Sequence, residues 1–356
     1  MEIAIEKAAD SELKAKPDES ALGFGQIFTD HMFVMSYSVE KGWHDATIKK
    51  YQDFSLDPSA MVLHYGQAIF EGLKAYRGRD GQIRLFRPLA NLDRMNISAA
   101  RMCMAQFDQD TVLSALKKLV KLDQTWVPRA KGSTLYIRPT MIASEAGLGV
   151  RPAREYLFFI ILSPVGAYYP EGFNPVKIYV TDKYVRAVRG GVGHVKTAGN
   201  YAASIMAAME AKKEGYTQVL WLDAIERRYI EEVGTMNIFF KINGQIITPP
   251  LGGSILPGIT RDSVLQITRD WGMEVLERPI AIDEVMEANE KGALEEIFGT
   301  GTAAVISPVG ELYYQGRAVR VNGGDTGEVA QRLYDELEAI QYGDKADPYG
   351  WVETME

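Results

Sequence analysis

The chain has 356 residues, of which 46% are hydrophobic and 24% are charged, and its formal net charge is −8. This length exceeds the size at which one hydrophobic core usually divides, so we expect two domains. No segment approaches the ~18 uninterrupted apolar residues of a membrane-spanning helix, and the polar residues 1–20 lack the features of a secretory signal. We therefore expect a cytoplasmic protein with no membrane partner. The acidic balance also excludes nucleic acid as an expected partner.

Several classes of enzyme are disfavoured by motifs that the sequence lacks. Cys103 is the single cysteine, which excludes an intrachain disulfide and a cysteine-based metal cluster. The four histidines are not spaced as metal ligands, so we expect no metal. There is no P-loop, no H-E-x-x-H and no G-x-S-x-G, and Gly190 to Gly193 does not meet the dinucleotide fingerprint. Kinases, hydrolases, zinc enzymes and nicotinamide dehydrogenases are therefore disfavoured.

The first half of the chain mixes strands with helices behind a polar, frayed arm at residues 1–20. Apolar residues recur at helical spacing over 112–120, behind a candidate N-cap at Asp110. The segment 147–152 is too rich in glycine and proline for a helix or a strand, which predicts an exposed or interface-lining loop. The strands predicted in this half are 26–38, 82–87, 133–142 and 155–162.

The second half continues the mixture of strands and helices. Asn243-Gly244 between two hydrophobic runs predicts a type I′ hairpin. Because hairpins are present and no regular strand-helix-strand repeat is visible, we predict an α+β (mixed α/β) fold and not a doubly wound parallel sheet. The expected strands are 176–181, 217–222, 236–242 and 245–248, and the expected helices are 200–214, 260–271 and 327–340. The expected organisation is an arm at 1–20, a small α/β domain at 21–163, an interdomain loop at 164–175 and a large domain at 176–356.

The segment from Gly190 to Tyr201 carries one lysine among small residues. Lys196 stands just before a predicted helix that Asn200 would cap. A nucleophilic lysine needs a desolvated or cationic setting, and small neighbours allow a flat ring to approach the backbone. Taken alone, the pattern is more typical of a solvated loop lysine than of a nucleophile.

Three further features strengthen the nucleophilic interpretation. The segments 257–261 and 299–304 combine glycines with hydroxyls, and the first opens a predicted helix, whose free N–H groups attract a phosphate. Each segment alone also fits a helix cap or a tight turn. Glu232 leads into a glycine turn and a strand, and such a carboxylate can keep the ring nitrogen of a pyridine cofactor protonated. A surface carboxylate is the ordinary alternative.

From about Gly23 onward, the sequence resembles the branched-chain aminotransferases of fold type IV. The resemblance lies in several motifs that occur in the family's order, and their combination is more specific than any one of them. The motifs are 65–76 (YGQAIFEGLKAY), 85–88 (LFRP), 91–95 (NLDRM), 136–139 (YIRP), 163–168 (SPVGAY), 190–201, 232–239 (EVGTMNIF), 256–261 (LPGITR) and 299–303 (GTGTA).

The resemblance implies a two-domain enzyme that uses pyridoxal 5′-phosphate, with its larger domain binding the cofactor. Lys196 would be the Schiff-base lysine, Tyr201 would bond the ring hydroxyl oxygen, and Glu232 would pair with the ring nitrogen. Arg87, Ile259, Thr260 and Thr302 would hold the phosphate, and Leu256 would pack on the ring. The substrate pocket would be formed by Tyr65, Phe70, Tyr136, Arg138, Tyr168, Thr302, Ala303 and, reaching the neighbouring subunit, Val150.

The implied reaction is transamination of L-leucine, L-isoleucine and L-valine with 2-oxoglutarate. The implied assembly is a homodimer or an assembly of dimers. The expected binding partners are small-molecule amino acids and 2-oxo acids. Arg138 would meet the distal carboxylate of glutamate, although a structural role in its strand is the alternative. The sequence departs from some eukaryotic members, which have a cysteine pair where this chain has Ala304 and Ser307, so thiol control there is not expected. Alternatives are a D-amino acid aminotransferase, an aminodeoxychorismate lyase or a ligand-binding protein without turnover.

Overall fold

The computed structural model describes residues 1–166 and 173–355. The chain divides into two compact units. The first contains Met1–Tyr168, Val195–Ala198 and Ala339–Glu356, and the second contains Tyr169–His194 and Gly199–Glu338. Within the described part of the chain, none of the helices is long and apolar enough to cross a membrane.

The units differ from the sequence-based domains at two short stretches. Residues 195–198 and 339–356 belong to the first unit, whereas the sequence placed both in the second domain. The expected interdomain loop, 164–175, includes residues 167–172, which lie outside the described residues. Its first two residues belong to a strand that continues to Val165.

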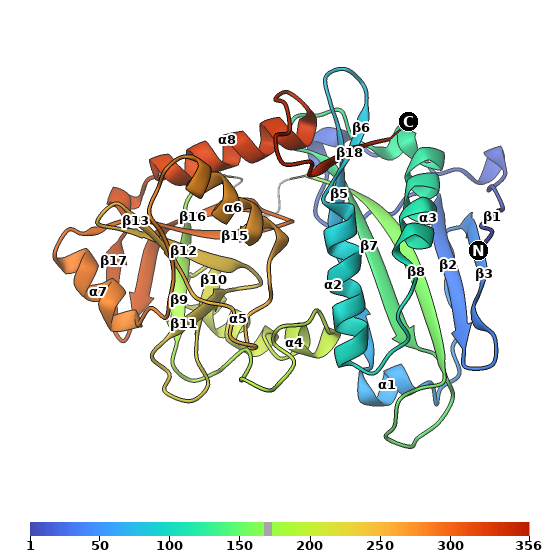
Figure 1. Cartoon of the computed structure of the whole chain (residues 1–356), viewed down its shortest axis with the longest axis horizontal. Helices are drawn as coiled ribbons and strands as arrows, with labels where there is room; N and C mark the ends of the chain where they lie inside the picture. The colour runs from blue at the N-terminus through green and yellow to red at the C-terminus, as the bar shows by residue number, and fades with distance from the viewer. Residues whose placement is uncertain (167–172, 356) are drawn as a thin grey trace. The chain divides into compact units, whose positions relative to one another are not determined.

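The first unit is built on a nine-stranded sheet (Figure 1). Its pairings are antiparallel except for the outermost pair, β1 with β3, which is parallel. In sheet order the strands are β1 (Ala4–Ile5), β3 (Gly42–Lys50), β2 (His31–Ser38), β8 (Glu155–Val165), β7 (Thr134–Ala143), β5 (Leu73–Arg77), β6 (Ile83–Phe86) and β18 (Val352–Thr354), and β4 (Ala68–Phe70) pairs with β7.

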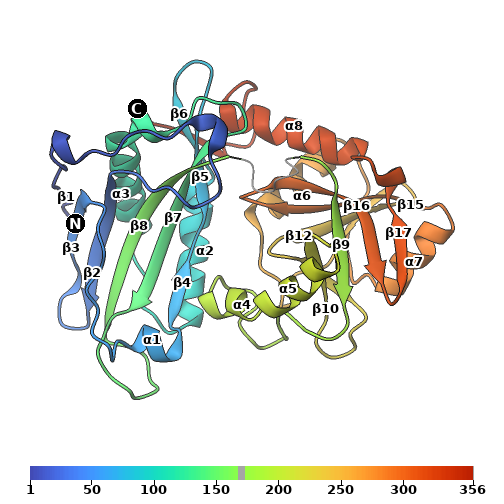
Figure 2. The ribbon, with the colours of Figure 1, turned by 180° about the vertical axis from the view of Figure 1, so that it is seen from behind.

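Two amphipathic helices cover one face of this sheet, as both views show (Figures 1 and 2). They are α2 (Pro88–Arg101) and α3 (Gln109–Leu122). Buried residues alternate along β8, and Phe158 and Ile160 join Leu92 of α2 and Leu116 of α3 in one hydrophobic core. The N-cap of α3 is Asp108, whose carboxylate accepts the Thr111 N–H at 2.8 Å, so the predicted cap at Asp110 was wrong by two residues.

The second unit contains a mixed nine-stranded sheet, which confirms the predicted fold class. β9 runs parallel to both of its neighbours, while the central strands pair antiparallel. In sheet order the strands are β11 (Ile230–Val233), β10 (Gln218–Leu222), β9 (Val176–Thr181), β16 (Val305–Tyr314), β15 (Leu294–Gly301), β12 (Asn237–Ile242), β13 (Gln245–Thr248) and β14 (Val275–Glu277), and β17 (Arg317–Arg320) pairs with β16.

Short helices complete both units. The helix predicted over 200–214 is divided, and Asn200 lies inside its first part, where its amide donates to the Val192 carbonyl at 2.9 Å, so it is not the predicted cap. The remaining helices are α1 (Met61–Tyr65), α4 (Ala198–Ala202), α5 (Ile205–Lys213), α6 (Ile259–Asp270), α7 (Ile282–Glu290) and α8 (Glu328–Tyr342), with 3₁₀ turns at Asp10–Glu12, Glu19–Ala21, Gln124–Trp126 and Asn322–Gly324.

The hairpin predicted at Asn243-Gly244 is confirmed. β12 and β13 pair antiparallel up to Ile242 and Gln245, and both turn residues have positive φ, 49° for Asn243 and 77° for Gly244. A type I′ turn requires this left-handed backbone at both central positions, which asparagine and glycine tolerate.

The N-terminal arm is ordered, in contrast to the frayed arm that the sequence predicted. The Ala8 N–H donates to Nε2 of His31 at 3.0 Å, and Nδ1 of the same ring lies 2.7 Å from Asp123. The Lys14 N–H donates to Asp30 at 2.8 Å, and the Trp126 indole donates to that carboxylate at 2.6 Å. Two buried acids of the first unit thus anchor a segment whose composition is that of a solvated tail.

A buried ion pair joins α2 to the end of β4. Arg94 donates to the two carboxylate oxygens of Glu71 at 2.7 and 2.9 Å, and the side chains of Arg94 and Glu71 are only 8% and 0% exposed. One helical turn later, Ser98 accepts the Lys196 N–H at 3.0 Å. The same face of α2 therefore holds both β4 and the lysine segment.

We predict that Arg94→Met lowers the free energy of unfolding by about 3–5 kcal/mol, because it leaves the Glu71 carboxylate buried without its cation. Urea unfolding followed by tryptophan fluorescence measures the change. Lys291→Met, in an ion pair whose side chains are 71% and 63% exposed, is the control and should leave the midpoint almost unchanged. Replacing Glu71 as well as Arg94 by methionine should recover most of the loss, and equal midpoints for Arg94→Met and the control would contradict the assignment.

Candidate functional site

Lys196 is held by its backbone against β4 in the first unit. The Phe70 N–H donates to the Lys196 carbonyl at 3.1 Å, and the Thr197 hydroxyl donates to the Ala68 carbonyl at 2.8 Å. The Lys196 N–H is bound by Ser98, as described above. These bonds fix the backbone of Lys196, so the side chain starts from a defined position. Its Nζ lies 4.7 Å from the centre of the Phe70 ring.

A second cation lies beside the same aromatic ring. The guanidinium carbon of Arg138 is 4.6 Å from the centre of the Phe70 ring, and its Nη2 donates to the Tyr136 hydroxyl at 3.2 Å. Tyr136 and Arg138 share one face of β7 because they are two residues apart on a strand. Nε of Arg138 is buried and has no hydrogen-bond partner among the described residues. The structure thus brings together Lys196, Phe70, Tyr136 and Arg138.

Other predicted residues of the first unit make contacts with other segments of that unit. Tyr65, at the end of α1, donates its hydroxyl to the Leu148 carbonyl in the glycine-rich loop, and Val150 in that loop is 85% exposed. Arg87 has a positive φ of 49° where α2 begins, and its guanidinium lies 5.2 Å from a ring of Trp351. Tyr168 lies outside the described residues.

In the second unit, a buried carboxylate is held from two sides. Glu232 on β11 is 3% exposed, and its Oε1 accepts the Leu256 N–H at 2.7 Å. Its Oε2 lies 3.2 Å from Nε of Arg186, in an ion pair whose side chains are 8% and 4% exposed. Tyr201 lies on α4, partly buried. A buried carboxylate in this setting is oriented by its neighbours and does not rotate freely in solvent.

The start of α6 combines backbone amides with hydroxyls. Gly258 is its N-cap residue and makes no side-chain cap, and Ile259 and Thr260 form the start of the helix. A β-carbon on Gly258 would lie 1.9 Å from Oδ1 of Asn237, whose amide donates to the Leu256 carbonyl at 2.9 Å. Only glycine fits this close approach, which ties the helix start to Leu256.

The turn after β15 has the same chemical character. Thr302 and Ala303 form the turn between β15 and β16, and Oγ1 of Thr300 is buried without a hydrogen-bond partner among the described residues. Orphaned hydroxyls and helix-start amides suit an anion, and the buried carboxylate suits a protonated ring nitrogen. The donor set of this unit therefore fits a phosphorylated pyridine cofactor.

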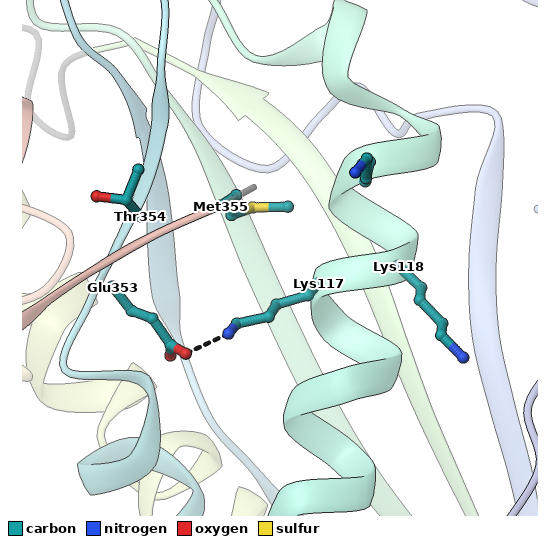
Figure 3. A pocket seen from close by; sticks show the side chains of 6 residues that line it. Lys117, Lys118, Glu353, Thr354 and Met355 are labelled. Atoms are coloured by element: carbon teal, nitrogen blue, oxygen red, sulfur yellow. Dashed lines mark hydrogen bonds and ion pairs between the residues drawn. The ribbon is translucent and has the colours of Figure 1, made fainter.

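A pocket of about 440 Å³ lies elsewhere in the first unit, between α3 and β18 (Figure 3). Lys117 faces Glu353 across it in an ion pair. Its other lining residues are Lys118, Lys121, Thr354 and Met355. None of the six was predicted as a site residue, and we assign them no part in catalysis.

The sequence missed three residues that support the site. Arg186 pairs with Glu232, Ser98 binds the Lys196 amide, and Asn237 joins Leu256 to the start of α6. Arg186 and Ser98 stand in no glycine-rich or charged pattern that would single them out. Asn237 lies in a segment that the sequence identified, but its role depends on contact with residues about 20 positions later.

Comparisons with known proteins agree with this chemistry. The family described as amino-transferase class IV matches residues 68–312. Branched-chain-amino-acid aminotransferase 2 of Bacillus subtilis (strain 168) is 58% identical over 339 residues, covering 95% of this chain and 93% of the relative. The crystal structure of Escherichia coli branched-chain amino acid aminotransferase is similar with a TM-score of 0.77 and 25% identity, covering 92% of this chain and 99% of that chain.

A second solved structure, the T.th. branched-chain amino acid aminotransferase with pyridoxamine 5′-phosphate, is similar with a TM-score of 0.75 and 27% identity, covering 91% of this chain and 98% of that chain. The resemblance found in the sequence motifs is therefore confirmed over almost the whole chain. From its sequence and its fold, the chain belongs to the class IV aminotransferases and, among them, to the branched-chain amino acid aminotransferases.

Proposed function

We propose that this protein transfers the amino group of L-leucine, L-isoleucine and L-valine to 2-oxoglutarate, giving branched-chain 2-oxo acids and L-glutamate, with pyridoxal 5′-phosphate as its cofactor. The observation that carries the proposal is the placement of Lys196 and Arg138 at one aromatic ring, within 4.7 and 4.6 Å of the centre of Phe70. A reactive amine next to apolar surface and one guanidinium suits substrates that are either hydrophobic or acidic.

We assign the residues that hold the cofactor from the family's motifs and from the contacts above. Lys196 carries it covalently, Glu232 pairs with the ring nitrogen, Tyr201 bonds the ring hydroxyl oxygen, and Leu256 packs against the ring. When bound, the cofactor supplies an electron sink for the bonds at the substrate's Cα. The phosphate is assigned to Arg87, Ile259, Thr260 and Thr302.

The chain's own residues move the proton and select the substrate. Nζ of Lys196 would take the proton from the substrate's Cα and deliver it to C4′ of the cofactor, so one amine would serve as nucleophile and as acid/base. Backbone amides of Thr302 and Ala303 bind the α-carboxylate. The rings of Phe70 and Tyr136 exclude water around a branched side chain.

Acceptance of glutamate as the second substrate is assigned to Arg138. Its guanidinium already donates to the Tyr136 hydroxyl at 3.2 Å, while its buried Nε has no hydrogen-bond partner among the described residues, so it has donors to offer to a distal carboxylate. Tyr65 and Tyr168 complete the pocket in this assignment.

We also propose that the enzyme works as a homodimer, or an assembly of dimers, in the cytoplasm. Val150 supports the dimer, because an apolar side chain that is 85% exposed on an anchored loop fits a position covered by a second subunit. The oligomeric state is checked by light scattering of the purified protein.

The function is tested by adding substrates in turn to purified protein saturated with pyridoxal phosphate. L-leucine should bleach the cofactor's visible absorption, and 2-oxoglutarate should restore it with formation of L-glutamate. A response to D-leucine but not to L-leucine would favour a D-amino acid aminotransferase. A bound cofactor that responds to neither would favour a binding protein without turnover.

We predict that Lys196→Ala abolishes turnover but leaves a folded protein, because covalent attachment and proton transfer both depend on that amine. Borohydride reduction of the wild-type protein, followed by digestion and mass spectrometry, locates the cofactor on the chain. The exposed Lys291, replaced by alanine, is the control and should retain activity. An adduct on any lysine other than Lys196 would overturn the assignment.

We predict that Arg138→Met slows the reaction with glutamate and 2-oxoglutarate by roughly 10- to 150-fold, the loss of one charge-assisted hydrogen bond of about 1.5–3 kcal/mol. Leucine has no distal carboxylate and should lose far less. Single-turnover spectroscopy of each half-reaction separates the two, with the leucine half-reaction as the internal control. Equal losses for both substrates would assign Arg138 a structural role.

A further inference from the structure

Two neighbouring glutamates of β11 lie at a break in the strand ladder. Trp221 of β10 lies opposite Glu232. The next residue, Leu222, lies opposite Ile230, so Glu231 is the extra residue of a β-bulge. Successive side chains of a regular strand point to opposite faces, but a bulge changes the direction of the side chains around it.

Because of the bulge, both carboxyl groups reach the segment 254–256. The Ser254 hydroxyl donates to Oε1 of Glu231, and the Leu256 N–H donates to Oε1 of Glu232 at 2.7 Å. The two residues are 7% and 3% exposed. Two acidic groups are therefore buried side by side in front of one loop.

Arg186 contacts one member of this pair and the backbone around it. Its Nε lies 3.2 Å from Oε2 of Glu232, in an ion pair that lacks the alignment of a hydrogen bond. Its Nη2 donates to the carbonyl of Gly193 at 3.0 Å and to the carbonyl of Ser254. A β-carbon on Gly193 would lie 2.2 Å from the Ser254 carbonyl oxygen, so the two segments that bind the guanidinium are closely packed.

The surroundings of the two acids differ in a way that separates their charges. Glu232 has the guanidinium and a backbone N–H, whereas Oε2 of Glu231 is buried with no hydrogen-bond partner among the described residues. Two adjacent carboxylates do not both ionise readily in a buried site. Burial raises the pKa of the Glu231 carboxyl, against the opposing effects of its bond from Ser254 and of the nearby arginines. The groups that face Glu231 are Ser254, Arg186, Arg189, Asp223 and Glu232.

We propose that Arg186 is a positioning residue that keeps the Glu232 carboxylate ionised and fixed in direction, while the adjacent Glu231 stays neutral. The proposal rests on the assignment of Glu232 to the ring nitrogen of the cofactor. A carboxylate that keeps a pyridine nitrogen protonated has to remain ionised itself. Arg186 forms an ion pair with Glu232, whereas Oε2 of Glu231 has no hydrogen-bond partner among the described residues, so the geometry assigns the charge of Arg186 to Glu232.

The first test follows the amino-acid half-reaction of the holoenzyme. Arg186→Gln should lower the rate at saturating L-leucine by roughly 10- to 150-fold, because Glu232 loses the neighbouring positive charge that favours its ionised form, with KM for leucine changed little. Arg186→Lys keeps the charge and should recover part of the rate. Arg84→Gln is the matched control, because Arg84 is also buried and also donates to a backbone carbonyl, that of Gln82, and to a carboxylate, that of Asp80, and its rate should stay near that of the wild type.

The second test measures thermal unfolding as a function of pH and needs no turnover. The pKa of Glu231 is higher in the folded state than its ordinary value of 4.5. As the pH rises above 4.5, the unfolded state therefore loses this proton more readily than the folded state, which lowers the stability of the fold. Glu231→Gln should therefore raise Tm relative to the wild type near pH 8 and leave it unchanged near pH 4. Glu232→Gln should lower Tm near pH 8, because it leaves Arg186 buried without its carboxylate.

A double-mutant cycle distinguishes this role from simple packing. In the Arg186→Gln background, Glu232→Gln should raise Tm near pH 8, because it then removes an unpaired buried charge. The same sign in both backgrounds, or a lower Tm for Glu231→Gln near pH 8, would overturn the proposal. A wild-type protein that forms no glutamate would refute the proposed function, and the Tm results would still decide the charge assignment.

Discussion

One face of α2 holds the part of the first unit on which the chemistry depends. Arg94 and Ser98 are four residues apart on this helix, so their side chains lie on the same face. Arg94 binds the buried Glu71 at the end of β4, and Ser98 accepts the Lys196 N–H. A buried guanidinium and carboxylate cannot separate without leaving two charges in a dry interior. The helix that holds the backbone of Lys196 is therefore itself fixed by a buried ion pair.

A buried ion pair also fixes a site residue in the second unit. Its central carboxylate, Glu232, is buried against Arg186 and a backbone amide, and the helix start next to it depends on a glycine that leaves space for Asn237. Pre-oriented charges of this kind act on a reacting group without reorganising during the reaction. The β-bulge at Glu231 brings a second acid to the same loop, and its different surroundings are what allow the two carboxyls to carry different charges.

The proposed use of two kinds of substrate rests on an aromatic ring that lies beside two cationic groups. Phe70 contacts both Lys196 and Arg138, so the amine and the guanidinium lie at one apolar surface. In the proposed assignment, a leucine side chain rests on the ring of Phe70 and the distal carboxylate of glutamate binds the guanidinium of Arg138. This arrangement explains how one site can serve both halves of a transamination without a change of cofactor.

The sequence by itself determined the mixed α/β class, the Asn243-Gly244 hairpin, the loop at 147–152 and the motifs of the family, because each depends on residues that are close together in the chain. The family resemblance also singled out Lys196, Phe70, Tyr136 and Arg138 as site residues, and the structure shows that their side chains are neighbours. Only the tertiary structure decided that the N-terminal arm is anchored by His31 and Asp30. His31 is itself held by Asp123, which lies 92 positions further along the chain. Arg186 likewise depends on Glu232, which is 46 positions away in the chain. Ser98 depends on Lys196, which is 98 positions away. No local pattern of residue types records such a pairing, since it is the packing of separate strands and helices that brings the partners together.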